Sequence, residues 1–137
     1  MANLKSSPSY EEMIAQAEAA VAALRDTYRE QLAADVVALG EIWDRLDLEN
    51  PDPGLQEVQS LAHNIKGQGG SFGYDLVTSI GASLCDYMRR SRRAAPKELE
   101  IVLAHIKLLK LVSDNDISGA GGETGERIVG RLRALTD

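Results

Sequence analysis

Length, composition and charge exclude several classes of protein. The chain has 137 residues, enough for one domain with a real core, and only 4% of them are aromatic, so Leu, Ile, Val and Ala must fill the interior, which favours helices. A net charge of −6 argues against a general nucleic-acid binder, because phosphate-backbone affinity needs clustered positive charge. The single cysteine, Cys85, cannot form an internal disulfide. The start has no apolar signal-peptide core, and no run approaches the about 18 apolar residues of a membrane span. We therefore expect a cytoplasmic protein with no membrane segment.

The first half of the chain predicts long amphipathic helices. Ser9 with Glu12 is a capping-box pattern that opens a first helix within residues 1–27. An apolar stripe predicts a second helix over about Tyr28 to Leu46. No helix breaker separates the two, so a single bent rod is an alternative.

The second half predicts four more helices after the loop "ENPDPG". Asp52 is expected as the N-cap of the next helix, with Pro53 at its first position. The later elements are a helix over about Tyr74 to Arg92, a helix from Pro96 that pairs with it antiparallel, a flexible loop over Ser113 to Gly125, and a last helix marked by Ile128, Val129, Leu132 and Leu135. The sum is an all-helical bundle.

The stretch "AHNIKGQGGSFGY", residues 62–74, places glycines where a helix is expected, although each costs about 0.5–1 kcal/mol there relative to alanine. At 100° per residue, one side of this helix is a core face with Val58, Ala62, Ile65, Gly69 and Phe72. The opposite side is polar, with Gln56, Gln59, Ser60, His63, Lys66, Gly67 and Gly70. Gly69 therefore lets a neighbouring helix come close. Gly67 and Gly70 flank His63 on the exposed side, where a missing Cβ lets another protein's backbone approach the imidazole.

Lys66, three residues after His63, completes a chemical pattern. A cation beside the imidazole favours the neutral ring, whose nitrogen is a nucleophile, and its ammonium can neutralise an incoming phosphoryl group. Phosphoryl transfer rests mostly on positioning and charge neutralisation, and a partner can supply the metal. The residues thus predict His63 as a phosphoacceptor stabilised by Lys66.

This motif resembles that of the histidine-phosphotransfer (HPt) domain, H-x-L/I-K-G followed by small residues, a hydrophobic residue and a glycine. The matching positions are His63, Ile65, Lys66, Gly67, Phe72 and Gly73. The sequence of the motif is closest to that of the HPt-type domain of chemotaxis histidine kinases, and the resemblance covers roughly Tyr28 to Val112. It implies an up-down antiparallel four-helix bundle, here with an extra N-terminal helix and a short C-terminal helix. We expect one domain, 1–137, with a bundle core of about 28–112, the N-terminal helix in 1–27, and a loop and helix in 113–137.

The resemblance also implies a function and partners. The chain is expected to be a phosphoryl carrier, not an enzyme, that relays a phosphoryl group between receiver-domain aspartates through His63. Receiver domains of response regulators are the expected partners, with a hybrid histidine kinase as a further candidate. Candidate docking residues are Gln59, Ser60, Gly67, Gln68 and Gly70. We expect magnesium on the receiver, no metal or cofactor on this chain, no nucleic acid, and a monomer, leaving open whether the N-terminal helix pairs two chains.

One position departs from the family pattern. Chemotaxis-type domains usually carry a glutamate on the following helix that hydrogen-bonds the histidine ring, and here that place falls on Cys85, with Asp86 beside it. A thiol cannot fix the ring tautomer as a carboxylate does. This favours receiver-to-histidine exchange over an alternative in which a separate kinase's ATP-binding domain phosphorylates the chain directly. A second alternative is a module that docks receivers without transferring phosphate.

Four further features are assigned structural roles. His105, among leucines, is expected at the boundary of the bundle, and Cys85 as a packed thiol. "RRSRR", Arg89 to Arg93, is expected to complement its helix dipole, with steering of an acidic receiver as the alternative. "DNDISG" from Asp114 resembles the opening of an EF-hand but has Gly125 at the twelfth position, so we interpret it as linker.

Overall fold

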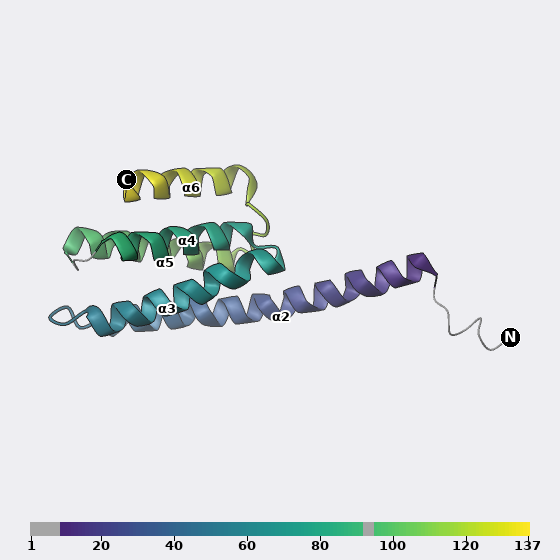
Figure 1. The fold of residues 1–137 in the computed structure, drawn as a ribbon, viewed down its shortest axis with the longest axis horizontal. Helices are drawn as coiled ribbons and strands as arrows, with labels where there is room; N and C mark the ends of the chain where they lie inside the picture. The colour runs from purple at the N-terminus through teal and green to yellow at the C-terminus, as the bar shows by residue number, and fades with distance from the viewer. Residues whose placement is uncertain (1–8, 92–94) are drawn as a thin grey trace.

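The computed structural model describes residues 9–91 and 95–137. Its elements are α2 (Tyr10–Asp44), α3 (Asp52–Gly69), the short 3-10 helix η1 (Gly70–Phe72), α4 (Asp75–Arg90), α5 (Pro96–Asp114) and α6 (Gly122–Thr136). Successive helices alternate in direction, and α6 lies along α4 and α5 on the side away from α2 (Figure 1). The all-α bundle expected from the sequence is confirmed.

α2 is one continuous helix of 35 residues, so the single-rod alternative is correct. Its start is as expected, because the Ser9 hydroxyl accepts a hydrogen bond from the backbone N–H of Glu12 at 3.1 Å. Residues 9–27 are exposed, and burial begins at Tyr28. The extra N-terminal helix is therefore the first half of α2, which runs on past the end of the bundle (Figure 1).

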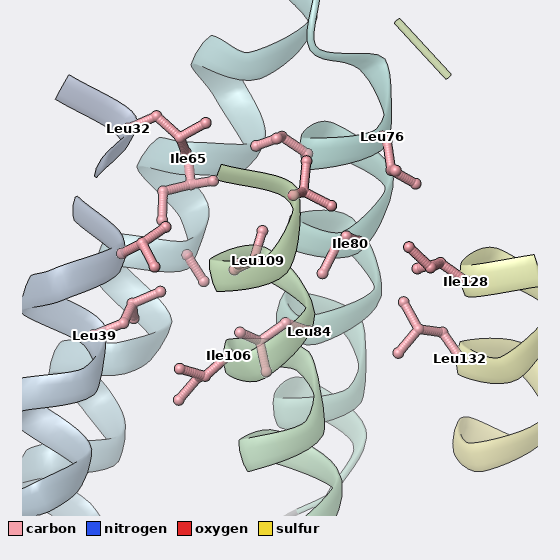
Figure 2. Packing of buried hydrophobic residues seen from close by; sticks show 14 of the residues in the cluster. Leu32, Leu39, Ile65, Leu76, Ile80, Leu84, Ile106, Leu109, Ile128 and Leu132 are labelled. Atoms are coloured by element: carbon pink, nitrogen blue, oxygen red, sulfur yellow. The ribbon is translucent and has the colours of Figure 1, made fainter. Parts of the chain in front are cut away.

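The core is formed by aliphatic side chains from all five long helices. Figure 2 shows Leu39, Ile65, Ile80 and Leu109 between the bundle helices, with Ile128 and Leu132 of α6 pointing toward α4. Each fully buried aliphatic side chain contributes about 1.5–3 kcal/mol by leaving water. The buried positions Val58, Ala62, Ile65 and Gly69 confirm the predicted core face of α3.

α3 and α4 cross closely because two glycines lie at the contact. A Cβ on Gly69 would stand 2.8 Å from Oγ1 of Thr78, and a Cβ on Gly81 would stand 3.1 Å from the Cα of Lys66. The Thr78 hydroxyl also donates a hydrogen bond to the backbone oxygen of Lys66 at 3.0 Å. The close approach predicted for Gly69 is confirmed, and Gly81 provides a second one.

The loop predicted over Ser113–Gly125 is wrong in its extent, and the part of it that remains outside helices is bonded to the bundle. Its first two residues end α5, and residues 122–125 begin α6. Between them, the N–H of Gly119 donates to the oxygen of Gly73 at 2.6 Å, and the oxygen of Gly119 accepts the N–H of Leu76 at 2.8 Å. The segment satisfies backbone groups at the start of α4, a long-range role that local composition does not show.

The carboxylate of Asp116 adds a polar contact to this docking. It accepts a hydrogen bond from the Tyr74 hydroxyl at 2.6 Å and pairs with Nε of Arg29 at 3.2 Å. The segment that resembles the opening of an EF-hand thus connects Arg29 of α2 to Tyr74, the residue before α4.

Two helix ends differ from prediction by small amounts. α3 begins at Asp52 itself, with Pro51 as its N-cap, so Asp52 and Pro53 each lie one position further into the helix than expected. α4 ends at Arg90, and position 92 lies outside the described residues. No helix in the described part of the chain is long and apolar enough to cross a membrane.

Candidate functional site

His63 lies on the exposed side of α3, opposite the buried face of that helix. Its side chain lines a surface depression between α3 and α4. The depression is lined by Gln56, Gln59, Ser60, His63, Asn64 and Lys66 from α3 and by Cys85 and Arg89 from α4. The structure thus brings together four predicted site residues, His63, Lys66, Gln59 and Ser60.

Two residues that line the depression, Asn64 of α3 and Arg89 of α4, are not predicted as site residues from the sequence. Arg89 was assigned to the end of its helix, and Asn64 to no role, yet both line the depression. Helical periodicity places residues around one helix but does not set its register against another. For Asn64, the sequence offers one signal, its position directly after His63.

Lys66 is held at the site by its backbone. The α4 backbone at Gly81 approaches its Cα, and Thr78 caps its carbonyl oxygen. The residue is half-buried, whereas His63 is exposed. The helix crossing therefore fixes the base of the Lys66 side chain. Lys66 and His63 both line the same solvent-open depression.

Gly67 and Gly70 are open, as their predicted role requires. A Cβ on Gly67 would meet no atom within 4 Å, and one on Gly70 would first meet Thr78 at 3.5 Å, an ordinary contact distance. Packing does not demand glycine at either position, in contrast to Gly69. Both glycines and Gln68 are exposed but lie outside the depression itself.

Cys85 occupies the wall of the depression as a half-buried thiol. Burial raises its pKa, although the positive charges of Lys66 and Arg89 act in the opposite direction. A protonated thiol gives the imidazole no anionic partner. The prediction of a packed thiol is confirmed by its contact with the core.

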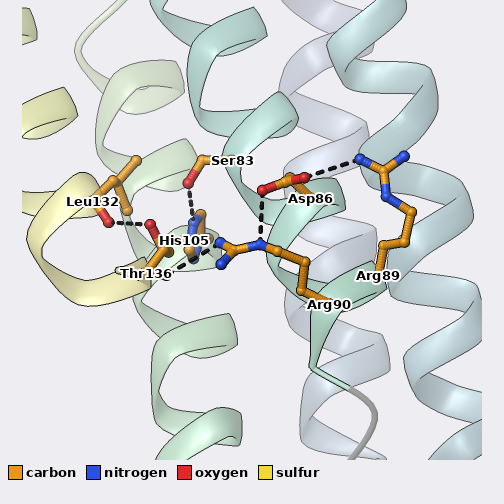
Figure 3. A network of polar contacts seen from close by, with 7 residues as sticks. All are labelled: Ser83, Asp86, Arg89, Arg90, His105, Leu132 and Thr136. Atoms are coloured by element: carbon orange, nitrogen blue, oxygen red, sulfur yellow. Dashed lines mark hydrogen bonds and ion pairs between the residues drawn. The ribbon is translucent and has the colours of Figure 1, made fainter.

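Asp86, next to Cys85, is directed to arginines instead. Its carboxylate oxygens accept hydrogen bonds from Arg89 and Arg90, each at 2.9 Å, and the bond from Arg89 is the main reason that its pKa is lowered. Arg90 also donates to the backbone oxygen of Thr136 at 3.1 Å and so ties α4 to the end of α6 (Figure 3). Arg92 and Arg93 of "RRSRR" lie outside the described residues.

His105 has a structural role but is deeper than the expected boundary position, with 0% exposure. Nδ1 lies 2.7 Å from the backbone oxygen of Ile101, which can only accept, so Nδ1 carries the proton. Nε2, 2.8 Å from the Ser83 hydroxyl, then accepts its hydrogen bond (Figure 3). Burial lowers the pKa of His105, so the ring is neutral and satisfied, which is why it tolerates the core.

No group of three or more His, Cys, Asp or Glu side chains that could hold a metal occurs in residues 9–91 and 95–137. The depression offers cations, amides and an imidazole instead, a set suited to an anionic group. The exposed imidazole of His63 and the half-buried Lys66 in this depression form a candidate site for a phosphoryl group.

Comparison with known families identifies the family of the chain. The model of the Hpt domain matches residues 9–114, well over half of the chain. The chain belongs to the Hpt domain family. It is therefore a phosphocarrier module of two-component signalling, whose partners are response-regulator receivers. The match includes the first half of α2, which the motif resemblance from Tyr28 onward did not cover. No curated protein and no solved structure matches the chain.

Proposed function

We propose that this Hpt domain relays a phosphoryl group between receiver-domain aspartates through His63. The observation that carries the proposal is the placement of His63 in one depression with Lys66 and Arg89, next to two exposed glycines that packing does not require. A receiver can approach this face along the open backbone at Gly67 and Gly70. Gln59, Ser60 and Gln68 are available around it as hydrogen-bonding groups.

The transfer step is a displacement at phosphorus. A neutral ring nitrogen of His63 attacks the phosphoryl group of the receiver's aspartyl phosphate, the P–N bond forms, and the P–O bond to the aspartate breaks. The proton on the ring's other nitrogen then leaves to solvent, and in the onward transfer the ring takes up a proton again as the P–N bond breaks and an aspartate oxygen of a second receiver bonds to phosphorus. The receiver's magnesium ion and the ammonium of Lys66 neutralise the charge on the phosphoryl oxygens.

Arg89 is a second cation available for this step. It lines the depression, and its pairing with Asp86 is between side chains that are 72% and 49% exposed. An exposed pair contributes only about 0–1 kcal/mol, so the guanidinium can turn to a phosphoryl group at little cost. This supports the steering alternative for "RRSRR" at one of its arginines.

Cys85 bears on the source of the phosphoryl group. Cys85, at the position of the family's glutamate, carries a protonated thiol, and the carboxylate of the neighbouring Asp86 is bound by arginines, so neither residue gives the imidazole an anionic partner. Exchange with a receiver depends least on an anionic partner for the imidazole, since the receiver brings both the metal and the activated phosphoryl group. The kinase-fed alternative predicts labelling from ATP by a separate kinase domain in the absence of any receiver.

The test is phosphate transfer from a panel of pre-phosphorylated receivers, scored as acid-labile, base-stable label. We expect label on the wild type, none on His63→Ala, and transfer slowed by about 10- to 150-fold in Lys66→Ala, the equivalent of one hydrogen bond to a charged group. Lys110→Ala is the matched control, because Lys110 is exposed on α5 and pairs only with Asp114 within the described residues. Chelation of magnesium should stop the transfer.

Two results would contradict the proposal. If no receiver labels a folded wild type, or if His63→Ala is labelled equally well, His63 is not the relay residue. Receiver binding that survives in His63→Ala together with an unlabelled wild type would support the phosphate-independent docking module instead.

A further inference from the structure

An apolar groove with a cationic rim runs between α5 and α6. Its residues are Ala104, Lys107, Leu108 and Leu111 from α5 and Thr124, Arg127, Ile128, Arg131 and Leu135 from α6. Leu111 and Leu135 keep 44% and 43% of their surfaces exposed, and no carboxylate lines the groove. In the part of the chain that the structure describes, none of the three cations forms an ion pair. In a chain of net charge −6, this surface is suited to an acidic amphipathic helix.

The same chain carries such a helix at the start of α2. Residues 10–24, here called the arm, contain three glutamates, Glu11, Glu12 and Glu18, and no lysine or arginine. Ile14, Val21 and Leu24 are 56%, 55% and 58% exposed. With Ala17 they follow the spacing i, i+3, i+7, i+10, which puts them on one face of the helix.

Helix formation alone does not account for this apolar stripe. The arm is otherwise rich in alanine, the best helix former, and β-branched Ile and Val lower helix propensity at exposed positions. An exposed stripe on a projecting helix is instead typical of a surface that packs against a partner.

The arm cannot fill the groove of its own chain. α2 is one unbroken helix whose first half leaves the bundle, whereas the groove lies between α5 and α6 (Figure 1). Two arms packed side by side would bring the three glutamates of each copy together, and the nearest cation to the stripe is Arg25 at its edge. The groove of another copy offers three cations and an apolar floor.

We propose that the arm of one copy docks in the α5–α6 groove of a second copy. The stripe covers the groove leucines, and Glu11 and Glu18, which lie at one edge of the stripe, face the cationic rim of the groove, whereas Glu12 lies on the opposite side of the helix. Reciprocal exchange closes a dimer, and one-way docking builds a chain of copies. The groove shares no residue with the depression around His63, so association leaves that site open. The monomer expected from the sequence is the alternative outcome of the solution-mass test.

The first test is the solution mass over a range of protein concentrations. Wild-type mass should rise above 14.8 kDa, and high salt should reverse the rise because the charges are screened. Val21→Lys should weaken association more than tenfold, whereas Val37→Lys, on the same helix at 58% exposure, should not. Arg127→Glu with Arg131→Glu should act as Val21→Lys does, and Arg133→Glu, outside the groove, should not.

The second test identifies the contact by disulfide trapping. With Cys85→Ser as background, no other cysteine remains, and single cysteines can be placed at Val21 in the arm and Leu111 in the groove. Mixing the two proteins under mild oxidation should trap the arm–groove heterodimer ahead of either homodimer. Predominant Val21→Cys homodimers, or a wild type that stays monomeric at about millimolar concentration, would overturn the proposal.

Discussion

Gly67→Ala should separate the stability of the domain from its ability to transfer phosphate. The new Cβ would meet no atom within 4 Å, so it introduces no steric strain in the folded chain. Replacing glycine by alanine inside a helix contributes about 0.5–1 kcal/mol, chiefly by restricting the unfolded chain. We therefore expect the free energy of unfolding to rise by that amount.

Transfer should respond in the opposite direction. If the receiver's backbone approaches His63 over Gly67, a methyl group there causes overpacking at the interface, which costs typically 1–3 kcal/mol. Because 1.4 kcal/mol is a factor of ten, the rate at subsaturating receiver should fall by about 5- to 150-fold. Gly40→Ala is the matched control, since its Cβ also meets nothing within 4 Å but lies on α2, outside the depression.

The assay pairs urea unfolding with the transfer rate from one phosphorylated receiver. Both variants should gain stability, and only Gly67→Ala should transfer slowly. Equal transfer rates in the two variants would refute the reasoning that the exposed glycines clear the approach to the histidine. A loss of stability in Gly67→Ala would show that the position is not open.

Three further substitutions test the packing. Gly81→Ala should lower the free energy of unfolding by about 1–2 kcal/mol, because its Cβ would lie 3.1 Å from the Cα of Lys66, and this overpacking exceeds the gain in helix propensity; an unchanged urea midpoint would contradict this. Burial lowers the pKa of His105 from its ordinary value of 6.5, so between that value and its folded pKa the unfolded chain binds more protons, and stability should fall on acidification through this window. His105→Gln should show a smaller slope in urea unfolding between about pH 7.5 and 5, and equal slopes would argue against the assignment. Tyr28→Phe should raise the free energy of unfolding by about 1 kcal/mol, because the buried Tyr28 hydroxyl has no hydrogen-bond partner among the described residues. Burial raises the pKa of this hydroxyl to about 12, and the ring can keep its stacking on Phe72 without it. A lower thermal midpoint would count against this.

The sequence by itself determined the features that lie within one helix. The offsets from His63 to Lys66 and Gly67 place these residues on one face whatever surrounds them, because the helical repeat fixes their relative directions. The same repeat predicted the buried side of α3, and Gly69 on that side was correctly predicted to admit a neighbouring helix. The phosphoacceptor hypothesis needed nothing beyond this local geometry.

Only the tertiary structure decided what faces His63 from other elements. Cys85 and Arg89 reach the depression because α3 and α4 cross at one register, to which the close contact at Gly81 contributes, and a shift by one turn would present different side chains. Likewise, Gly119 forms backbone hydrogen bonds with Gly73 at the end of the motif and with Leu76. The composition of the loop that contains Gly119 does not predict these bonds. Register between helices depends on the summed packing of the whole core, and no short stretch of sequence contains that sum.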